Sequence, residues 1–300
     1  MPPKFISITI LTRDDDCDNL RSVDVGYLQG LAENKDSVFQ VASNFNGIES
    51  VTEAIGPDTV NFLEKYAYDR TQGPAASISC GPAAISRLYC AFWADNKPIE
   101  EWAQTNEKQL NFLENCKAHF PQQNGFIKLS GNEPKFPRKY SKKYYQLLHS
   151  THICYHKECQ VTTGYKSAQG TLHIVSSYDQ TVDQVFCAAV NLTQGKHSKA
   201  NSQAPYIDAK CSFVLDMAYQ GTYLQAIANR RKKIFLTLVG GGAFGNKKEW
   251  IAESLIAAHR KWGHAQRTSL EQVFLVAFRQ SELGALPQML EKEGIPFEIV

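Results

Sequence analysis

The segment that decides the fold is IFLTLVGGGAFGNKKEWIAESLIAAHRKW, residues 234–262. An apolar run typical of a buried central strand, 234–239, leads directly into a glycine-rich loop and then into a helical pattern over 248–262. Glycines let the backbone take positive φ and approach a ligand without intervening side chains. The helix start adds unpaired N–H groups and a positive dipole end, so we interpret the loop as a phosphate site. The predicted phosphate-binding residues are Gly240, Gly241, Gly242, Ala243, Phe244, Gly245 and Asn246.

A tight turn with a glycine helix cap is the alternative interpretation of the same loop. The loop is not a Walker loop, because no Gly-Lys-Ser/Thr follows the glycines. Phe244 fits two roles, stacking on a ribose or base, or filling the core.

The composition is that of a soluble globular protein. Of 300 residues, 43% are hydrophobic and 21% charged, which suffices for a sizeable core and excludes wholesale disorder. A formal net charge of +2 gives no electrostatic reason to expect a nucleic acid or a membrane surface as partner. The eight cysteines are scattered, and neither a signal peptide nor a transmembrane run is evident. We therefore expect reduced thiols and a cytoplasmic protein.

Strand-like and helical patterns alternate along the chain, which predicts an α/β sheet covered on both faces. We expect one domain over 1–300, with 95–182 as an insertion made of a polar helical part and a β-hairpin or meander. The predicted strands are 5–11, 37–42, 153–155, 171–177, 184–190, 234–239, 272–278 and 296–300, and the predicted helices are 58–66, 81–93, 208–228, 248–262 and 281–293.

Polar loops follow three further segments. Asn44 and Asn46 end the strand in VFQVASNFNGIES, 38–50, where their amides suit ribose hydroxyls or a base, or simply form a turn. Asn191 ends the strand before 192–206. Ligands of open α/β sheets bind at the carboxyl ends of strands, so convergence of these loops predicts one ligand cleft. A small-residue loop before helix 81–93 adds Asp69, Thr71, Gln72 and Gly73.

Two aspartates on one predicted helix are the candidate catalytic residues. Asp208 occupies the expected N-cap position, and Asp216 interrupts an apolar run eight residues later. Asp216 is then either a solvent-facing helix residue or a partly buried acid with a raised pKa. Helix capping is the alternative role for Asp208.

Three of these segments resemble macrodomain-type ADP-ribose proteins. Ala-Ser-Asn-Phe-Asn, 42–46, resembles their ribose-side loop, and Gly-Gly-Gly-Ala-Phe-Gly-Asn, 240–246, resembles their second phosphate loop and a segment of poly(ADP-ribose) glycohydrolases. These two segments and Asp-Arg-Thr-Gln-Gly-Pro-Ala, 69–75, are similar to the divergent MavL-like group of Legionella effectors. The Gln-Glu-Glu signature of the glycohydrolases is missing.

The resemblance implies a three-layer α/β/α macrodomain-like mixed sheet. It further implies an ADP-ribosylhydrolase that removes ADP-ribose from a protein arginine, with ubiquitin as a possible partner, and Asp208 and Asp216 as the aspartates on which that group relies. Neither a cofactor nor a metal is expected. A non-catalytic ADP-ribose reader and a hydrolase of a small ADP-ribose derivative are the alternatives.

Overall fold

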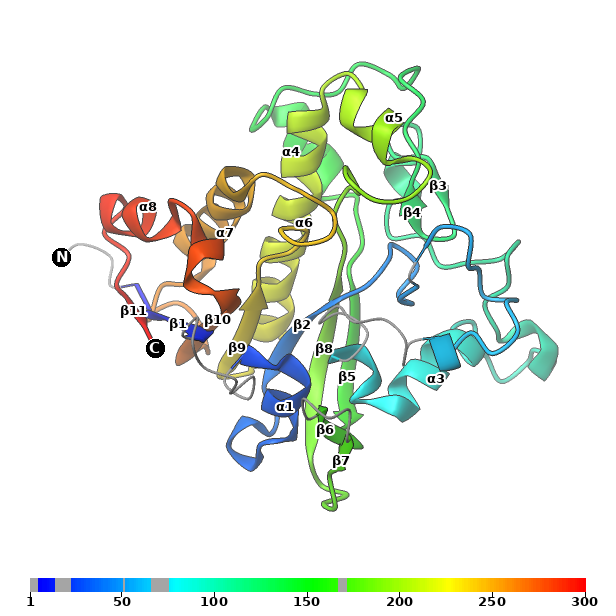
Figure 1. The fold of residues 1–300 in the computed structure, drawn as a ribbon, viewed down its shortest axis with the longest axis horizontal. Helices are drawn as coiled ribbons and strands as arrows, with labels where there is room; N and C mark the ends of the chain where they lie inside the picture. The colour runs from blue at the N-terminus through cyan, green and yellow to red at the C-terminus, as the bar shows by residue number, and fades with distance from the viewer. Residues whose placement is uncertain (1–4, 14–22, 51, 66–75, 167–171) are drawn as a thin grey trace.

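The computed structural model describes residues 5–13, 23–50, 52–65, 76–166 and 172–300. A seven-stranded mixed sheet forms its centre, in the order β11-β1-β10-β9-β2-β8-β5 (Figure 1). All neighbours pair parallel except β5, which runs antiparallel to β8 at one edge. The bounds are β11 Phe297–Ile299, β1 Ile8–Arg13, β10 Gln272–Arg279, β9 Lys233–Thr237, β2 Val38–Ala42, β8 Thr181–Cys187 and β5 Cys154–Gln160.

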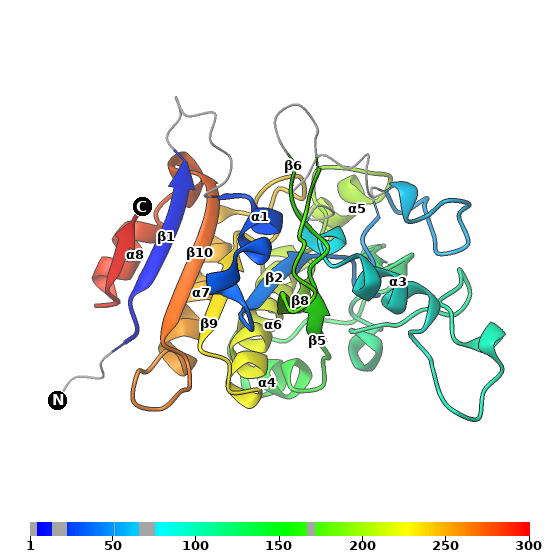
Figure 2. The ribbon, with the colours of Figure 1, turned by 90° about the horizontal axis from the view of Figure 1, so that it is seen from below.

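Helices cover both faces of this sheet. On one face lie α6 (Ile207–Ala228) and α7 (Lys248–Trp262), and α8 (Leu286–Lys292) packs against α7. On the other face lie α1 (Val25–Gly30) and α3 (Gly81–Tyr89). Figure 2 shows the strands side by side between these layers. The predicted three-layer α/β/α class is therefore confirmed.

Alternation along the strands divides the core between the two faces. On the α6 side, Ile234 and Leu236 of β9 pack beside the equivalent positions of β10. On the α1 side, Phe235 stacks between Phe39 of β2 and Phe274 of β10, with ring centroids 4.3 and 4.7 Å away. These three phenylalanines are in register, so this aromatic row joins the parallel strands β2, β9 and β10.

Residues 95–153 complete the core on the outer side of α6. They carry the 3-10 turns η4 (Ile99–Glu101) and η5 (Glu114–Cys116), the hairpin β3 (Gln122–Gln123) and β4 (Phe126–Ile127), and α4 (Lys142–Leu148). Phe120 stacks on Phe213 of α6 at 5.4 Å, and Tyr144 meets the same ring edge-on at 5.3 Å. This packing explains why α6 is buried almost all round.

Most of the predicted strands and helices are present in the structure, with different bounds. The predicted strands correspond to strands of the sheet, except 171–177, where β7 (Leu172–Ile174) instead forms a separate hairpin with β6 (Thr163–Lys166). The predicted α-helix 58–66 is wrong over its described residues, which form turns and, at 64–65, a 3-10 conformation. Asn61 there takes φ +58°, a left-handed conformation that ends any helix. The structure adds α5 (Ser198–Gln203), α1 and α4, all too short for a periodic signal.

No helix in the described ranges is long and apolar enough to cross a membrane. Seven cysteines are described and all carry free thiols.

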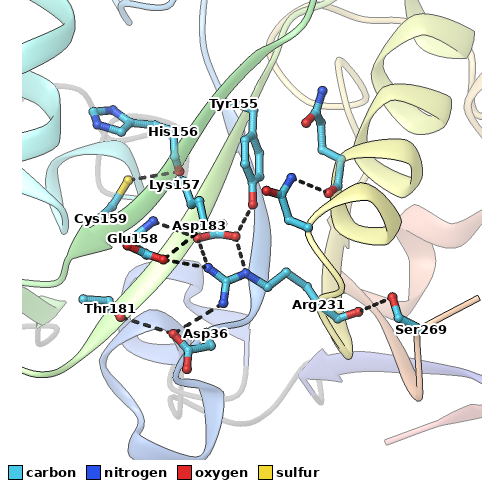
Figure 3. A network of polar contacts seen from close by, with 12 residues as sticks. Asp36, Tyr155, His156, Lys157, Glu158, Cys159, Thr181, Asp183, Arg231 and Ser269 are labelled. Atoms are coloured by element: carbon cyan, nitrogen blue, oxygen red, sulfur yellow. Dashed lines mark hydrogen bonds and ion pairs between the residues drawn. The ribbon is translucent and has the colours of Figure 1, made fainter.

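A buried ion pair joins strand β8 to the turn after α6 (Figure 3). The Asp183 carboxylate is fully buried and accepts hydrogen bonds from Arg231 Nε at 2.6 Å and Arg231 Nη2 at 2.9 Å. Tyr155 Oη and the Glu158 N–H of the edge strand β5 also donate to it. One carboxylate thereby links β5, β8 and the turn that leads into β9.

Asp183→Ala should lower the free energy of unfolding by about 3–5 kcal/mol, because it removes the buried acceptor of the Arg231 guanidinium and of two further donors. The guanidinium then keeps only its longer contacts to the exposed Asp36 and Glu158. Glu271→Ala is the matched control. It breaks the exposed Lys232–Glu271 pair, 2.8 Å long, and should leave the free energy of unfolding nearly unchanged. Urea unfolding of the two variants measures both values, and equal losses would contradict a special role for Asp183.

Candidate functional site

A cavity of about 630 Å³ lies at the carboxyl ends of the central strands. Four strands contribute, in sheet order β10, β9, β2 and β8. The lining residues at or next to their ends include Phe278, Thr237, Ala42 and Cys187. The predicted convergence of strand ends is thus present in the structure, and its volume is in the range of small-molecule sites.

The cavity opens where β2 and β9 separate. These strands pair only at Val38 and Phe39 of β2. At the next residue, the buried Gln40 side chain makes hydrogen bonds in place of the backbone pairing between the strands. Its Oε1 accepts from the Thr237 N–H at 2.9 Å, and its Nε2 donates to Thr222 Oγ1 of α6 at 2.9 Å. The amide satisfies buried groups that strand pairing leaves open. The parallel strands therefore diverge towards their carboxyl ends without an unpaired Thr237 N–H.

The glycine-rich loop, 240–246, forms one wall of the cavity through Gly240 to Phe244. Gly240 and Gly245 take positive φ, +73° and +64°, as this loop was predicted to require. A Cβ on Gly240 would lie 2.5 Å from Ala189 Cβ, whereas one on Gly242 would meet nothing within 4 Å. Gly240 is needed for the turn, and Gly242 leaves open space beside the backbone.

Three consecutive backbone N–H groups of this loop remain available. Turn bonds engage the N–H groups of Gly241, Gly245 and Asn246, which donate to Leu238, Gly242 and Gly240 carbonyls. Within the described ranges, the N–H groups of residues 242, 243 and 244 have no hydrogen-bond acceptor. Successive unpaired N–H groups beside a helix N-terminus suit an anion such as phosphate.

Asn246 supports the loop from behind and does not line the cavity. It is buried, and its Nδ2 donates to the Val190 carbonyl at 2.9 Å. Phe244 lines the cavity, and its ring packs towards Phe126 at 6.1 Å, which is the core contact predicted for it; stacking on a ribose or base stays a prediction.

The two predicted asparagines of the loop after β2 are buried and do not line the cavity. Asn44 Nδ2 donates to Ser50 Oγ at 3.0 Å. Asn46 Nδ2 donates to Gln109 Oε1 at 2.8 Å, and its Oδ1 accepts from the Ile48 N–H. Their neighbours Ser43, Glu49 and Ser50 line the cavity instead.

The loop after β8 is organised in the same way. Asn191 is buried; its Oδ1 accepts from the Thr193 and Gln194 N–H groups, and Gln194 lines the cavity. Glu53, only 5% exposed, joins this loop to the one after β2, since its Oε1 accepts from the Lys196 and His197 N–H groups.

The structure does not bring the two predicted aspartates into the cavity lining. Asp208 lies in the first turn of α6 and is not its N-cap, because Tyr206 holds that position; its side chain is 67% exposed and pairs with Lys247 at 3.7 Å. Asp216 is fully buried and accepts a 2.6 Å hydrogen bond from Tyr144 Oη. Burial raises the pKa of the Asp216 carboxyl, although this hydrogen bond lowers it, so the second of its two predicted settings is present.

Asp69, Thr71, Gln72 and Gly73 lie outside the described residues. Ala76, just after them, does line the cavity.

The ends of the cavity differ in chemistry. At the β10 end the wall is largely apolar, with Phe278, Leu283 and Leu286 beside Glu282. At the β2 and β8 end it is polar, with Ser43, Glu49, Ser50 and Gln194. Lys248 also lines the cavity, and its Nζ donates to the Ser281 carbonyl at 2.8 Å.

A thiol nucleophile does not suit this cavity. Cys187 is buried at its floor, and burial raises the pKa of this thiol to about 12, so it stays protonated at neutral pH. Among the described residues, no group of three or more His, Cys, Asp or Glu side chains is placed to hold a metal ion.

Sequence reasoning missed Glu49, Glu282 and Lys248 as cavity residues. Glu49 stands in the very stretch that drew attention to the asparagines, and a carboxylate in a strand-end loop was the available signal.

No protein-family model matches this chain, and neither does any curated protein. In fold it is similar to the crystal structure of poly(ADP-ribose) glycohydrolase from Deinococcus radiodurans in complex with ADP-ribose, at 14% identity over 97% of this chain and 87% of the other, with a TM-score of 0.50. Weaker matches are an Oceanobacillus iheyensis macrodomain mutant (9% identity, 98% of each chain, TM-score 0.39) and the Trypanosoma brucei macrodomain (13%, 37% of this chain and 38% of the other, 0.27). The glycohydrolase match shows a macrodomain-like fold.

Gly240→Ala should lower the free energy of unfolding by about 2 kcal/mol or more, because of its positive φ and the clash with Ala189. Gly242→Ala should leave it unchanged or raise it by up to about 1 kcal/mol, since the added methyl meets open space. Thermal and urea unfolding distinguish the two; equal losses would show that the loop geometry is not as described.

Proposed function

We propose that this chain binds ADP-ribose and hydrolyses the ADP-ribosyl bond on a modified protein. The observation that carries the proposal is the run of three available N–H groups, 242–244, on the wall of a cavity at the strand ends. Backbone N–H groups bind a pyrophosphate without a basic excess, in keeping with a net charge of only +2.

The order of strands suggests how the ligand would extend across the sheet. The glycine loop follows β9, which lies between β10 and β2. With the pyrophosphate at this loop, the apolar wall of Phe278, Leu283 and Leu286 suits the flat base. The hydroxyl and amide groups of Ser43, Ser50 and Gln194 suit the far ribose, whose anomeric carbon bears the protein.

Two comparisons support this ligand. The Deinococcus radiodurans glycohydrolase of similar fold was crystallised with ADP-ribose. The loop sequences at 42–46 and 240–246 also resemble macrodomain loops. The glycine spacing Gly240-x-Gly242-x-x-Gly245 also matches the dinucleotide-binding pattern. ADP-ribose and dinucleotides both contain a pyrophosphate, so both resemblances support a pyrophosphate ligand.

The resemblance to the MavL-like group supports arginine as the acceptor and ubiquitin as the modified protein. Cleavage breaks the bond from the ribose anomeric carbon to a guanidinium nitrogen, through a transition state with positive charge on the ribose. A carboxylate near that carbon stabilises the charge and activates water.

A second candidate function is a non-catalytic ADP-ribose reader. The placement of Asp208 and Asp216 outside the cavity lining favours it. The two candidates share the ligand and differ in turnover.

Calorimetry should detect ADP-ribose binding that is tighter than binding of AMP, because AMP lacks the second phosphate and the far ribose. Gly242→Asp should weaken ADP-ribose binding at least tenfold, since it places a carboxylate beside the phosphates. Gly242→Asn is the control of equal size and should weaken binding less. No ADP-ribose binding by the unaltered chain would refute the proposal. Equal affinities of all three proteins would show that the loop is a structural turn that does not bind phosphate.

Incubation with arginine-linked ADP-ribosyl-ubiquitin should release free ADP-ribose, measured by chromatography. The small derivative O-acetyl-ADP-ribose is the comparison substrate, and its faster cleavage would overturn the protein-substrate assignment. Binding of ADP-ribose without cleavage of either substrate would establish the reader.

A further inference from the structure

We propose that Glu49 is the catalytic carboxylate of this site, the group that activates water at the anomeric carbon. This inference rests on the proposed function. It gives Glu49 the catalytic role that the sequence predicted for Asp208 and Asp216.

Position within the cavity selects Glu49. Among the described lining residues, the only carboxylates are Glu49 and Glu282. Glu282 lies at the apolar β10 end, and its Oε2 accepts from the Phe278 N–H at 3.2 Å. Glu49 lies at the polar end with Ser43, Ser50 and Gln194, where the ribose hydroxyls are expected. Of these two described carboxylates, Glu49 is therefore the one that adjoins the expected position of the reacting carbon.

Three other described acidic residues, Glu53, Asp208 and Asp216, lie outside the cavity lining. Glu53 is buried, and its Oε1 accepts from two N–H groups of the loop after β8. Asp208 is exposed on α6, and Asp216 is bound to Tyr144 within the core. A general base must come within hydrogen-bond reach of the water whose proton it takes, which these three placements do not favour.

The chain on both sides of Glu49 is held in place by buried amides. Asn44 donates from its backbone N–H to the Ile48 carbonyl at 3.2 Å, and from its Nδ2 to Ser50 Oγ at 3.0 Å. These contacts fix the two residues that flank Glu49. The asparagine that the sequence singled out as a ligand contact is thus placed to act as a positioning residue for Glu49.

A second set of contacts fixes the preceding turn. Arg87 of α3 donates from Nε to the Gly47 carbonyl at 2.9 Å, and Gln104 donates from Nε2 to the Asn46 carbonyl at 3.0 Å. Because Arg87 and Gln104 are themselves buried, the turn has little freedom to move. Catalytic groups need such support from their surroundings to hold a productive geometry.

The chemical step balances with water alone. The water oxygen forms a bond to the anomeric carbon while the bond from that carbon to the arginine nitrogen breaks, its electron pair going to the nitrogen. The water proton passes to the Glu49 carboxylate and from there to the released guanidine. The products are ADP-ribose and an unmodified arginine.

Glu49→Gln should lower kcat for arginine-linked ADP-ribosyl-ubiquitin at least 100-fold, in line with the loss of a general base. Its Kd for ADP-ribose should stay within about threefold, because the amide keeps the size of the side chain. Glu49→Asp should retain an intermediate rate. Glu64→Gln is the matched control: this exposed carboxylate lies in the same segment, 43–65, outside the cavity lining, and its loss should leave the rate unchanged.

The pH profile provides a second readout. In the unaltered chain the acid limb of kcat/KM should report ionisation of the base, and Glu49→Gln should remove that limb from the residual rate. A merely structural role would lower the rate at every pH and lower the melting temperature as well.

Failure of this inference is distinguishable from failure of the proposed function. Cleavage by the unaltered chain with an equal rate for Glu49→Gln overturns the role of Glu49 alone. ADP-ribose binding without cleavage of arginine-linked ADP-ribosyl-ubiquitin or of O-acetyl-ADP-ribose overturns it too, and leaves a reader. Absence of ADP-ribose binding overturns the proposed function as a whole.

Discussion

The separation of β2 from β9 is the constraint on which the site depends. Two parallel strands that diverge expose N–H and C=O groups, and burying such groups without partners is costly. Gln40 resolves this conflict, because its side-chain amide accepts from the Thr237 N–H and donates to Thr222 of α6. β2 and β9 thereby separate towards their carboxyl ends. Nearer their amino ends they stay paired, where Phe39, Phe235 and Phe274 form a stacked row. Ligand loops of a doubly covered sheet need this opening.

Buried side-chain amides shape the rest of the cavity rim. Asn44, Asn46, Asn191 and Asn246 all bond to neighbouring chain segments, and none of them lines the cavity. The surfaces offered to a ligand are instead backbone N–H groups and the side chains next to these asparagines. Under the proposed function, backbone N–H groups bind the pyrophosphate, so the protein needs no excess of basic residues.

Much of the fold could be predicted from the sequence because strands and helices have local signatures. The run 234–262 specifies strand, glycine turn and helix through apolar periodicity and the conformational freedom of glycine. The site was harder to predict. Asp208 and Asp216 are separated by slightly more than two helical turns, which leaves them about 80° apart around the helix. Asp208 is exposed and Asp216 is buried, because residues 120–148 pack over the middle of α6. Helical spacing contains no information about such a covering segment.

The sequence by itself determined the α/β class, the strand ends that carry polar loops and the glycine turn, since each depends on neighbouring residues along the chain. The tertiary structure alone decided which side chains of those loops face the cavity. In the stretch 42–50 the asparagines, the serines and Glu49 are all polar, and local pattern treats them alike. Contacts from Arg87, Gln104 and Gln109, distant in sequence, hold Asn46 and Gly47 in place, while Glu49 and Ser50 lie at the cavity wall.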